Sequence, residues 1–149
     1  MKKTSNLIIP QGYWASIRRQ PDRTYQVEFP DWSHCIIFGD SLKEAVANAG
    51  EALSGVMEVA LDKGITIPFP SQHRGRGWHL IHPDLDVMIP WLIYLRRRQK
   101  GLTQSQVAKA MGVTQQTYRT FERVGKSNPR LSTVAKLAKV LEFELLPAA

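Results

Sequence analysis

Two short helices and the turn between them are encoded in residues 101–123, which read GLTQSQVAKAMGVTQQTYRTFER. Thr103 followed three residues later by Gln106 is a capping box, a pattern that predicts the start of a helix. Gly112 permits a left-handed backbone turn, and Thr114 can cap a second helix. Two short helices joined by a glycine-containing turn are typical of a helix-turn-helix unit.

The apolar residues of this stretch indicate how its helices pack. We expect Val107, Ala108 and Met111 to face inward from the first helix, and Tyr118 and Phe121 from the second. Ala108 is the residue that lets the two helices cross closely, because its side chain is small.

A further helix is expected near the C-terminus, capped by Ser132 or Thr133. Residues 142–146 could then form a short strand or a dimer contact. Four aliphatic residues of this last helix are expected to face inward: Val134, Leu137, Val140 and Leu141.

Positive charge is concentrated in the C-terminal half. Of the 149 residues, with a net charge of +7, residues 1–86 contain 9 Lys and Arg against 10 Asp and Glu, whereas residues 87–149 contain 11 against 3. This asymmetry favours a nucleic-acid-binding module joined to a module with a different partner, although a solvated basic surface would also explain it. The length excludes a large multidomain enzyme, and a hydrophobic content of 43% excludes a disordered tail.

Cysteine usage and hydropathy indicate a cytoplasmic protein with no membrane partner. Cys35 has no second cysteine to pair with, as is common in a reducing compartment. The apolar run of residues 7–9 is too short for a signal peptide, and residues 87–95 are too few to span a membrane. A helix is expected from Asp86, and Pro90 is tolerated in it if it falls within the first turn.

The N-terminal half begins with an expected antiparallel meander. Residues 12–39 alternate with the period of two that half-buried strands show. Residues 20–23 (QPDR) have the chemistry of a hairpin turn, and residues 35–38 are a plausible third strand. Two sets of side chains are expected on the inner face: Tyr13, Ala15 and Ile17, then Tyr25, Val27 and Phe29.

A long amphipathic helix should follow these strands. From Leu42 to Leu61, apolar residues recur by threes and fours around one stripe. Ser41 can cap the first turn while Glu44 reaches back to it, and Gly64 stands where a left-handed helix stop belongs.

Residues 64–90 are interrupted by Pro and Gly and indicate a connector, in which residues 78–81 could add an edge strand. The predicted fold is α+β: a small antiparallel sheet of three to four strands packed on one long helix, followed by an all-α helix-turn-helix domain. The predicted boundaries are 1–71 for the first domain, 72–86 for a linker and 87–149 for the second domain.

The second domain contains a set of short motifs at characteristic spacing: Leu102-Thr103-Gln104, Ala108, Gly112-Val113-Thr114, Phe121-Glu122-Arg123 and Asn128-Pro129. Over roughly residues 90–146, they resemble the phage-repressor-like helix-turn-helix family, and Gln115-Gln116 resembles the start of one lambdoid repressor's recognition helix. In that family an arginine of the first helix often pairs with the glutamate matched by Glu122, and Arg97 is our choice for it.

This resemblance implies which residues contact DNA. Gln104 would donate to a phosphate, while Gln115 and Gln116 would reach base edges, where Gln is suited to adenine. The alternative is that these are solvated polar residues, and the cations at 96–98 and 100 could equally be a solvated helix end. The full predicted DNA-binding set is Gln104, Thr114, Gln115, Gln116, Thr117, Arg119, Thr120, Arg123 and Lys126.

Four stretches of the first domain form a further pattern: residues 25–31 (YQVEFPD), 38–41 (FGDS), the alanine-rich helix 42–63 and residues 64–71 (GITIPFPS). Together they resemble the HicB antitoxin family. This resemblance implies a degenerate ribonuclease H-like fold that binds a HicA-type toxin, an mRNA-cleaving ribonuclease. A helix-turn-helix domain after it is an arrangement known in that family, and implies an antitoxin that represses its own operon as a homodimer or higher oligomer bound to double-stranded operator DNA.

The toxin-binding residues are not identified by the sequence; Trp14, Trp32 and Trp78 could be anchors for the toxin or core residues. A ligand-responsive transcription regulator and a residual metal-dependent ribonuclease stay as alternatives. We expect no catalysis, metal or cofactor. Of the candidate acids Asp22, Asp31, Asp40 and Glu51, the first lies in a turn and the next two at strand ends, where acids commonly serve solubility alone. The spacing of His73, His79 and His82 with His34 or Cys35 matches no tight pair of zinc ligands.

Overall fold

The computed structural model describes residues 10–143. Among these residues two compact units separate: 10–53 with 68–83, and 54–67 with 84–143. Each unit is described by itself. No helix in the described part of the chain is long and apolar enough to cross a membrane.

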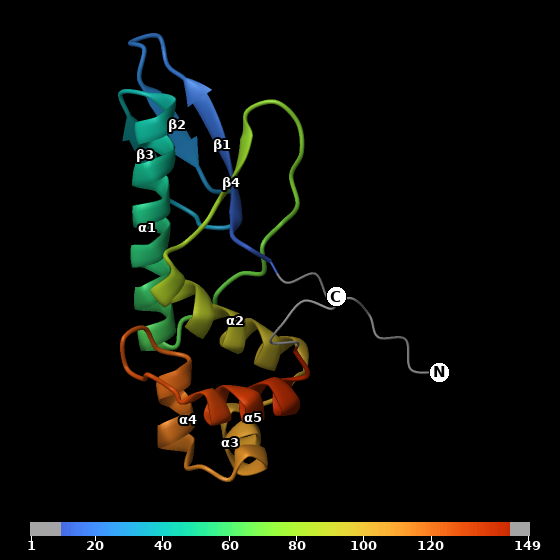
Figure 1. Ribbon diagram of the computed structural model, residues 1–149. Helices are drawn as coiled ribbons and strands as arrows, with labels where there is room; N and C mark the ends of the chain where they lie inside the picture. Colours follow the sequence, from blue (N-terminus) through green and yellow to red (C-terminus); the bar gives the residue numbers. More distant parts are fainter. Residues whose placement is uncertain (1–9, 144–149) are drawn as a thin grey trace. The chain divides into compact units, whose positions relative to one another are not determined.

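The first unit contains a four-stranded antiparallel sheet (Figure 1). Its strands are β1 (Tyr13–Arg19), β2 (Tyr25–Glu28), β3 (Ile36–Gly39) and β4 (Trp78–Ile81), in the spatial order β3–β2–β1–β4. The predicted hairpin turn is confirmed, because the N–H of Arg23 donates to the carbonyl oxygen of Gln20 at 2.9 Å. The expected edge strand at residues 78–81 also forms and pairs with β1.

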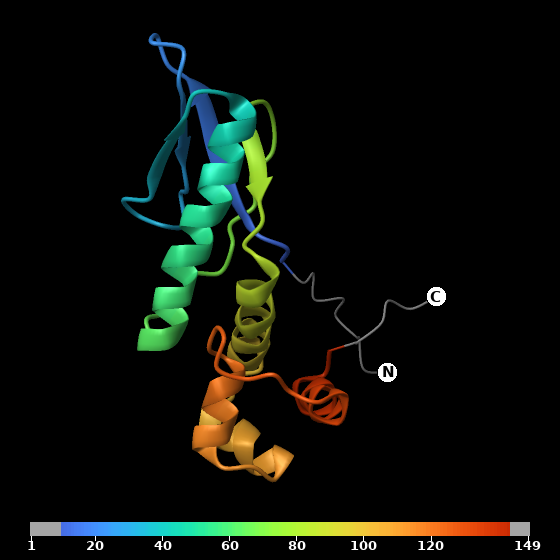
Figure 2. The same ribbon diagram turned by 60° about the vertical axis from the view of Figure 1, so that its left-hand side comes forward.

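Helix α1 (Leu42–Lys63) covers one face of this sheet with its N-terminal half (Figure 2). The predicted alternation is confirmed: Tyr13 and Ala15 are fully buried on β1, as are Ala45 and Ala49 on the facing side of α1. The predicted capping box is only half present, because Glu44 accepts a hydrogen bond from the N–H of Asp40, at 3.0 Å, and not from that of Ser41. Gly64 ends the helix at a φ of 68°, as predicted.

The strand register identifies the residues that form the other face of the sheet. Trp14 pairs with Leu80, Ser16 pairs with both Trp78 and Glu28, and Gln26 pairs with Phe38. Because side chains at paired positions share a face, one surface opposite α1 is formed by Trp14, Ser16, Arg18, Gln26, Glu28, Ile36, Phe38, Trp78 and Leu80. We call this surface the open face.

The second unit is helical. Besides the end of α1 it contains α2 (Leu85–Gln99), α3 (Gln104–Met111), α4 (Gln115–Phe121) and α5 (Leu131–Leu141). The predicted inward residues of α3 and α4 are confirmed, because they form one core with residues of α2 and α5. The buried members are Ile93, Val107, Ala108, Met111, Tyr118, Phe121, Leu137 and Leu141.

Two details of this unit differ from the expectations. Helix α2 begins at Leu85, so Pro90 lies beyond the first turn, inside the helix, where it is buried. Helix α5 begins at Leu131 after Arg130, and no side chain caps it. Ser132 and Thr133 therefore lie within its first turn, because the chain after Pro129 enters the helix earlier than the cap pattern suggested.

The boundaries 1–71, 72–86 and 87–149 stay a prediction. Two observations concern these boundaries. Residues 78–81, within the expected linker, belong to the sheet, and α1 contributes its last residues to the helical unit. A strand or dimer contact was expected at residues 142–146, but positions 144–146 lie outside the described residues.

Candidate functional site

Side-chain caps fix the starts of α3 and α4. Thr103 accepts from the N–H of Gln106 at 3.1 Å, and the Gln106 side chain accepts from the N–H of Thr103 at 2.8 Å, so the predicted capping box is complete. Gly112 ends α3 at a φ of 71°, a left-handed conformation that suits glycine. Thr114 then accepts from the N–H of Thr117 at 3.1 Å, which confirms the second cap.

Helix α4 has one buried and one exposed side. Its buried residues, Tyr118 and Phe121, pack edge to face with ring centroids 6.0 Å apart. The exposed residues include most of the predicted DNA-binding set: Gln115, Gln116, Thr117 and Arg119, with the capping Thr114 and, beyond the helix, Lys126. The helix-turn-helix thus presents a polar surface of the kind that reads base edges in a major groove.

A buried hydrogen-bond network holds α2 and α4 together. Nε of Arg97 donates to Glu122 Oε1 at 2.5 Å and Nη2 donates to Oε2 at 3.0 Å, so the pairing predicted by the family resemblance is confirmed. The hydroxyl of Tyr118 donates to the same carboxylate at 2.7 Å. Burial disfavours the charged guanidinium, but the hydrogen bond and charge of Glu122 outweigh it and raise the pKa of Arg97.

Tyr118, on α4, is fully buried within this network. Burial and then the charge of Glu122 raise its pKa far above the ordinary range, so the hydroxyl stays protonated as a donor. Its position four residues before Glu122 puts both side chains on one face of a helical turn. This i, i+4 spacing was the sequence signal that could have revealed the contact.

Gln104 lies between the core and the predicted DNA surface. Its Nε2 donates to Glu122 Oε2 at 3.0 Å, so the carboxylate orients the side chain, which is half-buried. An amide nitrogen carries two N–H groups, and one is enough for this bond. The predicted phosphate contact of Gln104 therefore stays a prediction that the geometry permits.

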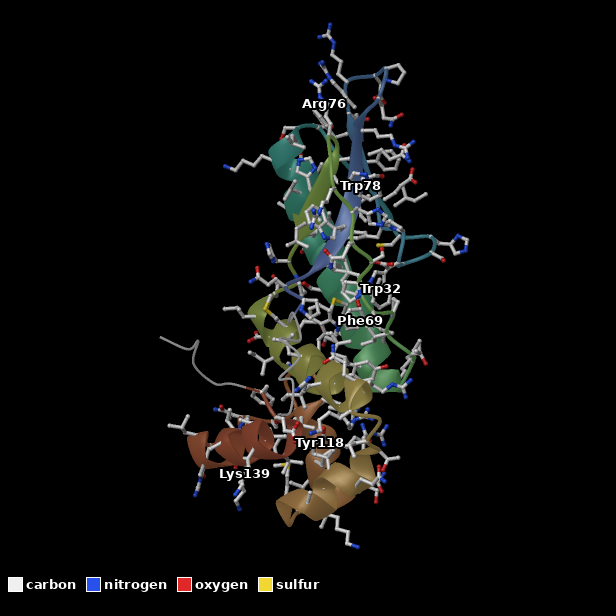
Figure 3. The ribbon with its side chains drawn as sticks, turned by 90° about the vertical axis from the view of Figure 1, so that its right-hand side faces the viewer. Trp32, Phe69, Arg76, Trp78, Tyr118 and Lys139 are labelled. Atoms are coloured by element: carbon white, nitrogen blue, oxygen red, sulfur yellow. The ribbon has the colours of Figure 1, made fainter. Side chains whose placement is uncertain are left out.

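Other basic residues of the second unit differ in their surroundings. Arg96 donates to the carbonyl oxygens of Leu141, at 2.8 Å, and Glu142, at 2.6 Å, so it stabilises the end of α5. Lys100 pairs with the carboxylate of Glu142 at 3.0 Å. In Figure 3, Tyr118 lies among the helices while Lys139 projects away from α5.

The three tryptophans considered as toxin contacts are half-buried. Trp78 stacks on His73 with ring centroids 3.9 Å apart, and Trp32 packs edge to face on Tyr13 at 5.6 Å. Figure 3 shows Trp78 on the open face. As the tryptophans are partly occupied by intramolecular packing, they stay candidates only.

Sequence reasoning missed the most exposed apolar residues of the open face. Ile36 and Phe38, both on the edge strand β3, are each 53% exposed. The available signal was that these two residues are two positions apart on a short apolar strand and so share one of its faces. Nothing in the sequence says that this face points away from α1.

The acids and histidines weighed for metal chemistry have separate local roles. Asp22 accepts from Thr24, which holds its pKa below the usual range, and Asp31 accepts from the N–H of Ser71 at 3.0 Å. His82 contacts the carbonyl oxygen of Gln11 at 2.9 Å. Within residues 10–143, no three His, Cys, Asp or Glu residues form a group that could hold a metal ion.

Two family models match the chain. Residues 13–84 match the HicB-like antitoxin of bacterial toxin-antitoxin systems, and residues 93–146 match the helix-turn-helix family. The chain therefore joins a HicB-like antitoxin domain to a C-terminal helix-turn-helix domain, as the motifs predicted.

Among solved structures, the crystal structure of the Burkholderia pseudomallei antitoxin HicB is similar to this chain, at 18% sequence identity and a TM-score of 0.43. The similarity covers 66% of this chain and 93% of that one. No curated protein sequence matches the chain.

Proposed function

We propose that this chain is the antitoxin of a type II HicAB module, which neutralises an mRNA-cleaving HicA-type toxin by covering it and represses its own operon as an operator-bound dimer. The observation that carries the proposal is that one chain combines a HicB-like antitoxin domain with a helix-turn-helix whose α4 exposes two adjacent glutamines. Both roles are binding roles, so the chain needs no catalytic group or metal. Both partners would be met in the cytoplasm.

Operator recognition would divide between bases and phosphates. Gln115 and Gln116 each offer an amide donor and acceptor, which match N6 and N7 of adenine in the major groove. Arg119 and Lys126 are exposed near them and would neutralise phosphates. Two-fold-related half-sites about one helical turn apart, roughly 34 Å, would require a dimer.

We expect Gln115→Ala and Gln116→Ala each to weaken binding to the matching operator by about 1–3 kcal/mol, because a base-edge contact is lost. Each variant should lose discrimination at its own base pair only. Fluorescence anisotropy with operator duplexes substituted one base pair at a time measures both effects.

The matched control is Gln72→Ala, which removes the same amide from an exposed position of the first unit. It should bind every duplex as the parent does. Variants at Gln115 and Gln116 that rank the substituted duplexes as the parent does would contradict the base-reading assignment.

The open face is the surface we propose for toxin binding. Ile36 and Phe38 expose apolar area at its β3 edge, and Trp14 and Trp78 lie on the same face. Exposed aromatic and aliphatic residues clustered on one face mark protein interaction sites. The neighbouring polar residues Gln26 and Glu28 hydrogen-bond each other at 2.5 Å, which lowers the cost of covering them.

We expect Phe38→Glu to weaken binding of the HicA-type toxin by about 2 kcal/mol or more, because a charge replaces an exposed apolar anchor of the contact. Co-expression with the small protein encoded next to this chain should then no longer rescue growth. Isothermal titration of the purified pair measures the loss of affinity.

Leu42→Glu is the control for this substitution. Leu42 is 42% exposed in the first turn of α1, away from the open face, where an acidic residue also suits the helix dipole. It should keep full neutralisation. A neighbouring protein that is not toxic, or a Phe38→Glu variant that neutralises it as well as Leu42→Glu does, would argue against this part of the proposal.

A further inference from the structure

One cation of the predicted DNA-binding set is held by an acid distant in sequence. Nε of Arg123 donates to Asp62 Oδ1 at 2.9 Å, and Nη2 donates to the same oxygen. Asp62 lies in the last turn of α1, within the helical unit, and is 61 residues from Arg123. The pair therefore fastens the residues that follow α4 to the end of a helix outside the helix-turn-helix.

Asp62 is surrounded by the positive charges of this surface. The hydrogen bond from Arg123 holds the pKa of Asp62 below its usual range, and the charges of Arg123, Lys126 and Arg119 add to the effect. The carboxylate is thus ionised at neutral pH. The three cations that act on it all belong to the predicted DNA-binding set.

A carboxylate and a phosphate compete for the same donors. The guanidinium fork fits either anion with parallel N–H groups, and both anions prefer it for that reason. The side chains of Arg123 and Asp62 are 27% and 47% exposed, so the pair lies at the surface, within reach of a DNA backbone. A phosphate that binds Arg123 through these donors must displace Asp62.

We propose that Asp62 is an internal competitor for the DNA backbone, which occupies Arg123 in the free protein and sets how selectively the helix-turn-helix binds its operator. This inference rests on the proposed DNA-binding function. Phosphate contacts raise affinity for every sequence alike, whereas base contacts distinguish sequences. By weakening one phosphate contact, Asp62 leaves a larger share of the binding free energy to Gln115 and Gln116.

The opposite role is also physically reasonable and gives the opposite result. If Asp62 aimed Arg123 at a phosphate without being displaced, its removal would weaken DNA binding, because the guanidinium would lose its orientation. The sign of the change in affinity therefore distinguishes a competitor from a positioning residue.

The experiment uses the full-length chain, its Asp62→Asn variant and two duplexes, one from upstream of its own gene and one of unrelated sequence. Asp62→Asn should bind the unrelated duplex several-fold more tightly at low salt, with a log–log salt slope steeper by about 0.9, the value for one more neutralised phosphate. The ratio of operator to unrelated affinity should fall. Anisotropy titrations over a salt series measure all three quantities.

Two controls isolate the contact. Glu58→Gln removes the same charge from an exposed position one turn earlier on α1, and should change affinity much less, because salt screens a more distant charge. In an Arg123→Gln background, Asp62→Asn should have no further effect on the salt slope. Melting curves confirm that each variant is folded, and Asp62→Ser replaces Asp62→Asn if the latter is not.

Each other outcome overturns the inference. Unchanged or weaker binding by Asp62→Asn excludes a competitor, and an equal effect of Glu58→Gln shows a general charge effect. If Asp62→Asn still changes the salt slope in the Arg123→Gln background, competition for Arg123 is not the mechanism. If the parent protein binds neither duplex, the proposed DNA-binding function fails and takes this inference with it; if the parent binds and Asp62→Asn does not tighten binding, only the inference fails.

Discussion

Replacement of Glu122 by alanine is expected to lower the free energy of unfolding of the helical unit by about 3–5 kcal/mol, because it leaves a buried guanidinium without its counter-charge. Arg97 and Glu122 are only 7% and 3% exposed. The same change removes the acceptor of the buried Tyr118 hydroxyl and of the half-buried Gln104 amide. Calorimetry of the full-length chain, in which the two units can melt separately, measures the loss.

Three variants test whether charge or hydrogen bonding dominates this network. Tyr118→Phe removes one neutral donor and should cost only about 1 kcal/mol. Replacement of the pair together, Arg97→Met with Glu122→Leu, should cost much less than Glu122→Ala, because no unpaired charge is left. Glu51→Ala, at an exposed position of α1, is the control for loss of a carboxylate at the surface. A cost of less than about 1 kcal/mol for Glu122→Ala would mean that water reaches Arg97.

This network also shows how far the sequence could predict the site. The capping of α3 and α4 could be predicted because each cap depends on residues three positions apart, as with Thr103 and Gln106. The pairing of Arg97 with Glu122 could be predicted only through resemblance, since nothing local relates residues 25 positions apart. The hydrogen bond from Tyr118 to Glu122 could have been predicted from helical spacing, because the two residues are four positions apart.

Other features depend on tertiary structure and had no local signal. Asp62 meets Arg123 because the end of α1 belongs to the helical unit, which no periodicity encodes. The exposure of Ile36 and Phe38 could not be predicted, because a short apolar strand looks the same whether one of its faces is covered or both. The condition that Pro90 fall within the first turn is not met, because α2 begins at Leu85 and Pro90 lies inside the helix.

Gly39→Ala is expected to destabilise the first unit by about 3 kcal/mol or more, because the added methyl group meets backbone and not a flexible side chain. An ideal Cβ on Gly39 would overlap the backbone nitrogen of Ala45 and lie 2.7 Å from its Cα. Gly39 ends β3 and Ala45 lies in the first turn of α1, so strand and helix approach here backbone to backbone. The methyl group would push the helix from the sheet whose open face we propose for toxin binding. Chemical denaturation, monitored through tryptophan fluorescence, measures the change.

Gly55→Ala makes the same chemical change within α1 and should have the opposite sign. Apart from the neighbouring backbone of its own helix, no atom lies within 4 Å of an ideal Cβ at Gly55, so the substitution adds helix propensity without a clash and should stabilise by about 0.5–1 kcal/mol. If both variants were stabilising, the start of α1 could shift away from β3 at little cost, and toxin binding by Gly39→Ala would then be unaffected. If Gly39→Ala is destabilising and also weakens toxin binding, the close contact of Gly39 with Ala45 is what keeps β3, with Ile36 and Phe38, in place on the open face.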